Sequence, residues 1–140
     1  GVHILVDHAR GMDYFAADTD HFVERIIRLL GAHRVSTWRF KTIPDTADPR
    51  FAADQPPTPL PPVGVPVIVL GGLALGEGLV RTRRGWRRFL STARNHRVVL
   101  VTPLTETVIR PELPPDLPIV TWDRTTSDRD IHRLLGGMEW

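Results

Sequence analysis

The sequence has no cysteine and no long apolar run. The absence of cysteine excludes disulfides and cysteine-ligated zinc, and it fits a reducing compartment. The longest apolar stretch, residues 63–75, is interrupted by Pro66 and by glycines. It falls short of the roughly 20 residues that an apolar helix needs to cross a bilayer. We therefore expect a cytoplasmic protein without a membrane partner.

Lysine is almost missing as well: Lys41 is the one lysine among 18 basic residues, and the rest are arginine. The net charge is only +2. Arginine in place of lysine, together with abundant alanine, proline and glycine, is typical of a GC-rich genome. We interpret the basic character as a consequence of codon composition rather than as a sign of nucleic-acid binding.

The length of 140 residues, with 41% hydrophobic and 24% charged residues, is that of one soluble globular domain. Residue 1 is glycine, and an apolar run begins directly after it without a basic leader. We therefore expect a single domain over residues 1–140 that is a piece of a longer, multidomain protein.

Five short apolar runs predict buried strands. The run over 66–70, PVIVL, is the most apolar, which predicts a central position in a sheet that is buried on both faces. The five predicted strands are Val2–Val6, Arg34–Phe40, Pro66–Leu70, Arg97–Val101 and Pro118–Trp122.

Three segments with helical spacing separate these strands. The first has caps in Asp18–Asp20, apolar positions from Phe22 to Leu30, and Gly31 after its end. The second places Leu79, Trp86, Phe89, Leu90 and Ala93 on one stripe. The third begins after Ser127, carries Ile131, Leu134 and Leu135, and stops at Gly136. The proline-rich connection 44–62 is predicted to lack regular structure, and 103–118 is a second proline-rich connection.

Strands that alternate with helices predict an α/β fold: a three-layer α/β/α Rossmann-like sandwich around a mainly parallel five-stranded sheet. Ligands of such sheets bind beyond the carboxyl ends of the strands. We expect the functional edge to comprise Asp7–Met12, 41–45, Gly71–Glu77 and Thr102–Thr105. The predicted binding-edge residues are Asp7, His8, Arg10, Gly11, Gly71, Gly72, Glu77 and Thr102.

The segment Asp7–Met12, between an apolar strand and an amphipathic helix, resembles the first metal-site motif of von Willebrand factor A-type domains, Asp-x-Ser-x-Ser. The later run Val67–Leu73 is similar to the family's apolar strand that ends in Ser-Asp-Gly. The resemblance covers most of the chain in the order of its elements. It implies a fold whose metal site normally sits at this edge.

The chain departs from the family at the residues that would bind metal. Ala9 and Gly11 stand at the two serine positions, and the later aspartate aligns with Gly72 or Gly71. Thr42 and Thr46 are the candidates for the family's metal-site threonine. Mg²⁺ prefers near-octahedral oxygen ligation, which Asp7 with one threonine cannot supply. We therefore expect a degenerate site without metal or cofactor.

Metal-free relatives of this kind imply scaffolding or protein recognition inside bacterial multidomain proteins. We expect a non-catalytic protein-interaction module, whose partner is another protein or a neighbouring domain of the same chain.

Asp7 has a structural interpretation too, because a carboxylate at a strand end can accept backbone N–H groups of the following turn. His8 and Arg10 beside it are candidates for contact with an acidic partner.

Two alternatives stay open. The first is an enzyme that uses Asp7 with Glu77 or His8. The chain has no Gly-x-Ser-x-Gly turn, no phosphate-loop motif and no His-x-x-x-His pair. These absences disfavour a serine hydrolase of that type, a phosphate-loop nucleotide-binding enzyme and an enzyme with a helical zinc motif.

The second alternative is a nucleic-acid-binding module that uses a basic helix. That basic patch comprises Arg81, Arg83, Arg84, Arg87 and Arg88. Trp86 lies on the predicted buried stripe, so we expect it in the core.

Overall fold

The computed structural model describes residues 1–45, 47–72, 80–122 and 128–136. For residues 10, 11, 80–82, 112 and 128 it describes the backbone only. Five parallel strands form one sheet in the order β2-β1-β3-β4-β5. The strands are β1 (Val2–Asp7), β2 (Val35–Phe40), β3 (Val67–Leu70), β4 (Val98–Thr102) and β5 (Ile119–Thr121). The predicted α/β class and parallel sheet are confirmed.

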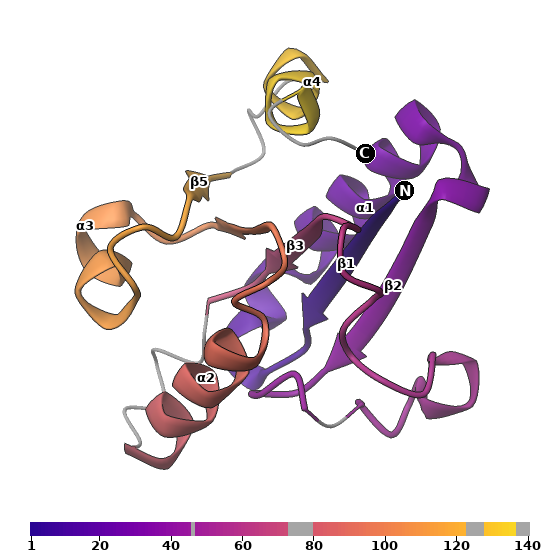
Figure 1. Ribbon diagram of the computed structural model, residues 1–140. Helices are drawn as coiled ribbons and strands as arrows, with labels where there is room; N and C mark the ends of the chain where they lie inside the picture. Colours follow the sequence, from indigo (N-terminus) through magenta and orange to yellow (C-terminus); the bar gives the residue numbers. More distant parts are fainter. Residues whose placement is uncertain (46, 73–79, 123–127, 137–140) are drawn as a thin grey trace.

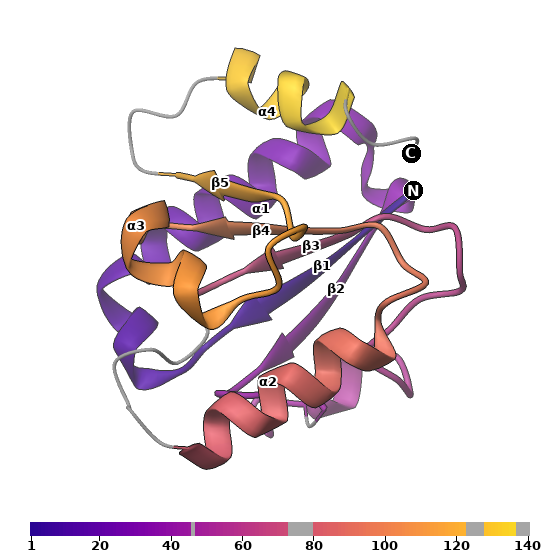
Figure 2. The ribbon, with the colours of Figure 1, turned by 60° about the vertical axis from the view of Figure 1, so that its left-hand side comes forward.

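Helices cover both faces of the sheet (Figures 1 and 2). They are α1 (Ala16–Leu30), α2 (Val80–Thr92), α3 (Glu106–Ile109) and α4 (Asp128–Gly136). The described residues also form the short 3-10 turns η1 (Arg10–Phe15), η2 (Ala32–Arg34), η3 (Ala52–Asp54) and η5 (Arg110–Glu112). None of the described helices is both long enough and apolar enough to span a membrane.

Alternate side chains of β1 point to opposite faces and build two separate cores. Val2, Ile4 and Val6 pack with α1 and α4 on one face. On the other face, Leu5 packs with side chains of α2 and α3. β3 lies in the middle of the sheet and its four residues are buried, which confirms the central position predicted for the PVIVL run.

The first helix begins earlier than its sequence suggests. Asp18, Thr19 and Asp20 were expected to cap it, but α1 starts at Ala16 and no side chain caps it. The turn η1 runs directly into α1, and the N–H of Ala16 donates to the carbonyl of Asp13. Backbone carbonyls of this turn therefore meet helix N–H groups that a capping side chain would otherwise satisfy.

The end of α1 agrees with the prediction. Gly31 follows the helix with φ 92° and donates its N–H to the carbonyl of Ile27. A residue with a side chain is strained at this φ, which explains glycine here. At the other end of the chain, Gly136 closes α4 as expected, while Ser127 lies outside the described residues.

The two proline-rich connections have more order than their composition suggests. The second contains the short helix α3 and the turn η5. The first carries η3 and is tied to the sheet by two histidines. Nε2 of His3 lies 2.8 Å from the carbonyl oxygen of Pro59, and Nε2 of His96 lies 2.8 Å from that of Pro61. Because a carbonyl only accepts, each Nε2 is the donor.

The same connection also packs against α2. Gly85 lies inside that helix, where glycine costs about 1 kcal/mol relative to alanine. A Cβ atom on Gly85 would collide with the side chain of Ile43. The glycine therefore allows close approach between the helix and the connection.

Candidate functional site

The strand order 2-1-3-4-5 reverses between β1 and β3, which is the switch point where parallel α/β sheets bind ligands. Asp7 ends β1 and Gly71 follows β3 at this point. A Cβ on Gly71 would lie 2.5 Å from Cβ of Asp7 and 3.0 Å from its Oδ2. The Asp7 side chain thus occupies the space beside Gly71, and only glycine leaves that space open.

Asp7 is turned into the protein. It is 2% exposed, and its Oδ1 accepts the N–H of Ala9 at 2.8 Å. This contact confirms the structural interpretation of Asp7 as a carboxylate that closes the turn after its own strand. Thr102 does the same at the end of β4: it is fully buried, and its hydroxyl oxygen accepts the N–H of Leu104 at 3.2 Å.

Apolar side chains pack beside Gly72 at the switch point. A Cβ on Gly72 would lie 3.4 Å from the sulfur of Met12 and 3.5 Å from Cδ1 of Leu104. Both are ordinary van der Waals distances, so this part of the crevice is filled by the chain itself. The packing leaves Gly72 buried rather than available to a ligand.

The structure describes the remaining predicted residues to different extents. His8 is half-buried and lies at the surface of this edge. For Arg10 and Gly11 only the backbone is described, within the turn η1. Glu77 lies outside the described residues, as does Thr46. Thr42, the other candidate metal-site threonine, has φ 69° and sits in the connection after β2.

His8 belongs to a stack of cationic and aromatic groups that sequence reasoning missed. Its ring stacks on Phe51 with centroids 5.1 Å apart, and its Nε2 lies 3.1 Å from Nη1 of Arg39. The guanidinium carbons of Arg39 and Arg50 lie 5.1 and 5.5 Å from the centroid of the Phe51 ring. Such distances are typical of cation–π contact. We call His8, Arg39, Arg50 and Phe51 the cation–aromatic cluster.

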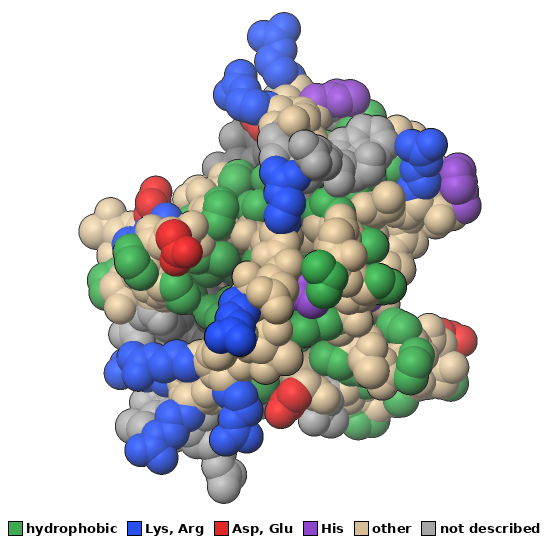
Figure 3. All heavy atoms as spheres, in the orientation of Figure 1, with side chains coloured by type: hydrophobic (Ala, Val, Ile, Leu, Met, Phe, Trp, Pro, Cys, Tyr) green, Lys and Arg blue, Asp and Glu red, His purple; other side chains and the backbone are tan. Residues whose placement is uncertain are grey.

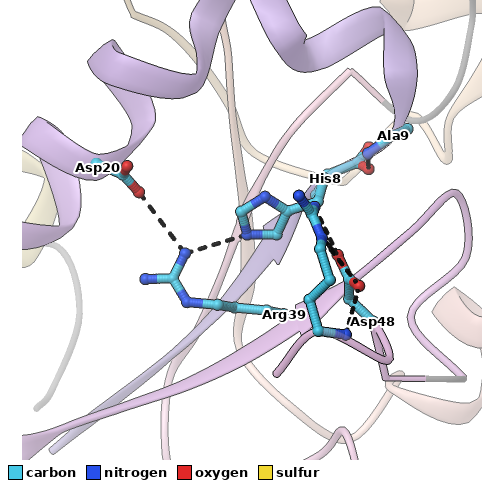
Figure 4. Close-up of polar contacts among 7 residues, drawn as sticks. His8, Ala9, Asp20, Arg39 and Asp48 are labelled. Carbon is cyan, nitrogen blue, oxygen red and sulfur yellow. Dashed lines mark hydrogen bonds and ion pairs between the residues drawn. The ribbon is translucent and has the colours of Figure 1, made fainter. Parts of the chain in front are cut away.

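Two carboxylates fix the arginines of the cation–aromatic cluster. Figure 4 shows Asp20, Arg39 and His8 in series, with 3.6 Å between Oδ1 of Asp20 and Nη1 of Arg39. Asp48 is fully buried, and its carboxylate accepts from Nε and Nη2 of Arg50, the shorter contact being 2.8 Å. These hydrogen bonds lower the pKa of Asp48 from its ordinary value.

Burial lowers the pKa of His8, and the neighbouring charge of Arg39 lowers it further. A neutral His8 can accept a hydrogen bond from Arg39 through Nε2, and a protonated one cannot. The cluster is thus arranged around an uncharged imidazole. Sequence spacing gave no signal for it, because Phe51 and Arg50 come from the proline-rich connection.

The described part of the edge forms no cluster of side chains that could bind a metal ion. Among the residues that the structure describes, no group of three or more His, Cys, Asp or Glu side chains could hold a metal ion. Nε2 of His8 meets Arg39 rather than a carboxylate. Of the Asp7–Glu77 pair, only Asp7 is described.

The predicted basic patch lies along α2, and Figure 3 shows Lys and Arg side chains gathered over that helix. Arg83, Arg84, Arg87 and Arg88 are exposed, and only the backbone of Arg81 is described. Trp86 is 4% exposed and packs edge-on against Phe40 and Phe89, which confirms its place in the core. Leu79, at the start of the predicted stripe, lies outside the described residues.

Comparison with known proteins adds no relative: no family model, no curated protein and no solved structure matches this chain.

Proposed function

We propose that the chain is a non-catalytic protein-interaction module of von Willebrand factor A-type fold that has lost its metal site. It works within a cytoplasmic, multidomain bacterial protein, and its partner is another protein or a neighbouring domain. The observation that carries the proposal is the inward position of Asp7. Its Oδ1 is held by the N–H of Ala9, and its side chain is packed against Gly71.

The outward groups of the same edge support recognition of a protein. Tyr14, in the turn η1 that follows β1, is 92% exposed. Arg50, in the cation–aromatic cluster, has a side chain that is 60% exposed, and the charge of Asp13 reaches it. Tyrosine and arginine are the residue types that dominate the binding energy of protein interfaces. We infer that Tyr14 and the cluster contact the partner.

The cation–aromatic cluster is also held in place before any partner arrives. Arg39 is fixed by His8 and Asp20, and Arg50 is fixed by the buried Asp48. Side chains that are already ordered lose less entropy on binding. A rigid surface of this kind suits recognition, while catalysis would need a titratable group that faces the substrate.

Selection of phage-displayed peptides on the folded domain tests the proposal. The selected peptides are expected to bind the edge formed by Tyr14 and the cation–aromatic cluster, as mapped by amide chemical shifts. Tyr14→Ala should weaken binding about tenfold or more, since interface tyrosines often contribute over about 1.4 kcal/mol. Val63→Ala is the matched control, because Val63 is 70% exposed and lies before β3 at the opposite end of the sheet.

The proposal fails if the selected peptides bind elsewhere on the domain. It also fails if Tyr14→Ala and Val63→Ala change the affinity by the same factor. Both positions are exposed, so neither substitution should disturb the fold.

A further inference from the structure

A second candidate site lies at the amino end of the sheet, away from Asp7. A pocket of about 740 Å³ opens where β4 and the edge strand β5 begin. Figure 2 shows the last turns of α2, the start of β4 and the segment that leads into β5 around this end of the sheet. The volume falls in the range of small-molecule sites, about 300–1,000 Å³.

The lining of the pocket is largely apolar. It takes residues from α2, from β4 and β5, from the turn before β5 and from α4. The apolar side chains that define it are Leu90, Val98, Leu117, Val120 and Leu134. Each of these is only half-buried in the protein, so a ligand that covered them would remove apolar surface from water.

Arginine side chains line the pocket on the side of α2. Arg87 lies in α2 together with Leu90 and Ser91, and Arg94 lies in the turn that follows Thr92, the last residue of the helix. Within the described part of the chain, neither Arg87 nor Arg94 forms an ion pair. Among the described residues of the lining, one carboxylate, Asp116, stands against Arg87 and Arg94. The pocket therefore combines an apolar floor with excess positive charge.

The wall opposite α2 is fixed by a specific contact. Nη1 of Arg110 donates to the carbonyl of Leu117 at 2.8 Å, and its other nitrogens pair with Glu106 at 2.9 Å and 3.2 Å. Pro114 and Pro118 further restrict this turn, since proline fixes φ. A wall that is ordered in advance favours binding, because less conformational entropy is lost.

We propose that this pocket binds a small amphipathic carboxylate. The apolar body lies on Leu90, Leu117 and Val120, and the carboxylate meets the guanidinium groups of Arg87 and Arg94. Charge complementarity selects an anion, and the apolar lining selects a ligand with a hydrocarbon body. The site is independent of the interaction proposed for the carboxyl edge.

Titration of the domain with octanoate, followed by amide chemical shifts, tests the proposal. Shifts should concentrate at pocket residues such as Ala93, Val98 and Val120, with a Kd of about 1 mM or tighter for a ligand of this size. The neutral match, octan-1-ol, should bind at least about fivefold more weakly, because it lacks the charge-assisted contact.

Matched double variants separate binding in the pocket from general attraction to a basic surface. The double variant Arg87→Gln/Arg94→Gln should weaken octanoate binding about fivefold or more. Arg84→Gln/Arg88→Gln removes the same charge from exposed positions outside the pocket lining and should change the Kd less than about twofold. The amide spectrum of each variant reports whether it is folded.

Results of three kinds would overturn the proposal. The first is the absence of shifts at pocket residues up to about 10 mM octanoate. The second is equal affinity for octan-1-ol, or equal weakening by both double variants. The third is a dimer in sedimentation that buries the pocket, which would make a second copy of the chain its occupant. None of these results bears on the carboxyl edge, so the two proposals fail separately.

Discussion

Replacement of Gly71 by alanine tests the packing at the switch point most sharply. The new Cβ would lie 2.5 Å from Cβ of Asp7, whereas carbon atoms in contact prefer about 3.5–4.0 Å. Neither Cβ can rotate away, because each is fixed to the backbone of its own strand. Relief requires that β1 and β3 move apart by about 1 Å at their ends.

Forced overpacking of this kind typically costs about 1–3 kcal/mol in the free energy of unfolding. For a chain of this length, that corresponds to a drop in Tm of about 3–10 °C. Thermal and urea unfolding, followed by circular dichroism, would measure it. Gly136→Ala is the control: nothing lies within 4 Å of the added Cβ at this helix end, so its Tm should hold or rise slightly.

A double-mutant cycle identifies the colliding partner. Asp7→Gly removes the Cβ that the methyl group added at position 71 would meet, so the penalty of Gly71→Ala should shrink by about 1 kcal/mol or more in that background. The reasoning is refuted if Gly71→Ala unfolds at the wild-type midpoint. It is also refuted if the two substitutions are simply additive.

Two further predictions concern the segments that pack around the sheet. Thr42→Gly should keep the urea midpoint or raise the stability by up to about 1 kcal/mol, because a β-branched residue is strained at φ 69°; a clear loss of stability would contradict the strain. Burial lowers the pKa of His3 from 6.5, so the folded state binds fewer protons than the unfolded state just below that pH. Stability should therefore be full above about pH 6.5 and fall below it, by up to about 1.4 kcal/mol per pH unit, until the lowered pKa of His3 is passed. His3→Gln should flatten this slope between about pH 7.5 and 5.5; an unchanged slope in His3→Gln would refute the assignment.

The positions of the strands and of the long helix α1 could be predicted from the local pattern of apolar residues. The runs VHILV and PVIVL are apolar enough to demand burial on both faces, and all five strands appear where such runs occur. The turn η1 and the helix α3 were missed, because each is short and lacks an apolar period. The start of α1 was predicted too late in the chain. Asp18 has the side chain of a typical N-cap, and the sequence does not show that the preceding turn continues directly into the helix.

The location of Asp7 could be predicted from the sequence, but the side-chain contacts around it could not. Asp7 could be placed at the carboxyl edge from one strand boundary, and its role in the following turn needs only a residue two positions away. The cation–aromatic cluster needs contacts across a connection with no periodicity, as between His8 and Phe51. The pocket at the other end depends on how α2 and the turn before β5 meet, which no local pattern encodes.

The most direct test of the account is calorimetric titration of the domain with Mg²⁺ and Mn²⁺. Asp7 is 2% exposed and is engaged by the N–H of Ala9, and Ala9 offers no side-chain oxygen. Hard cations need several oxygen ligands, so we predict no binding stronger than the millimolar range. Micromolar binding that Asp7→Ala abolishes would contradict the proposed loss of a metal site, and with it the proposal that this edge recognises a protein.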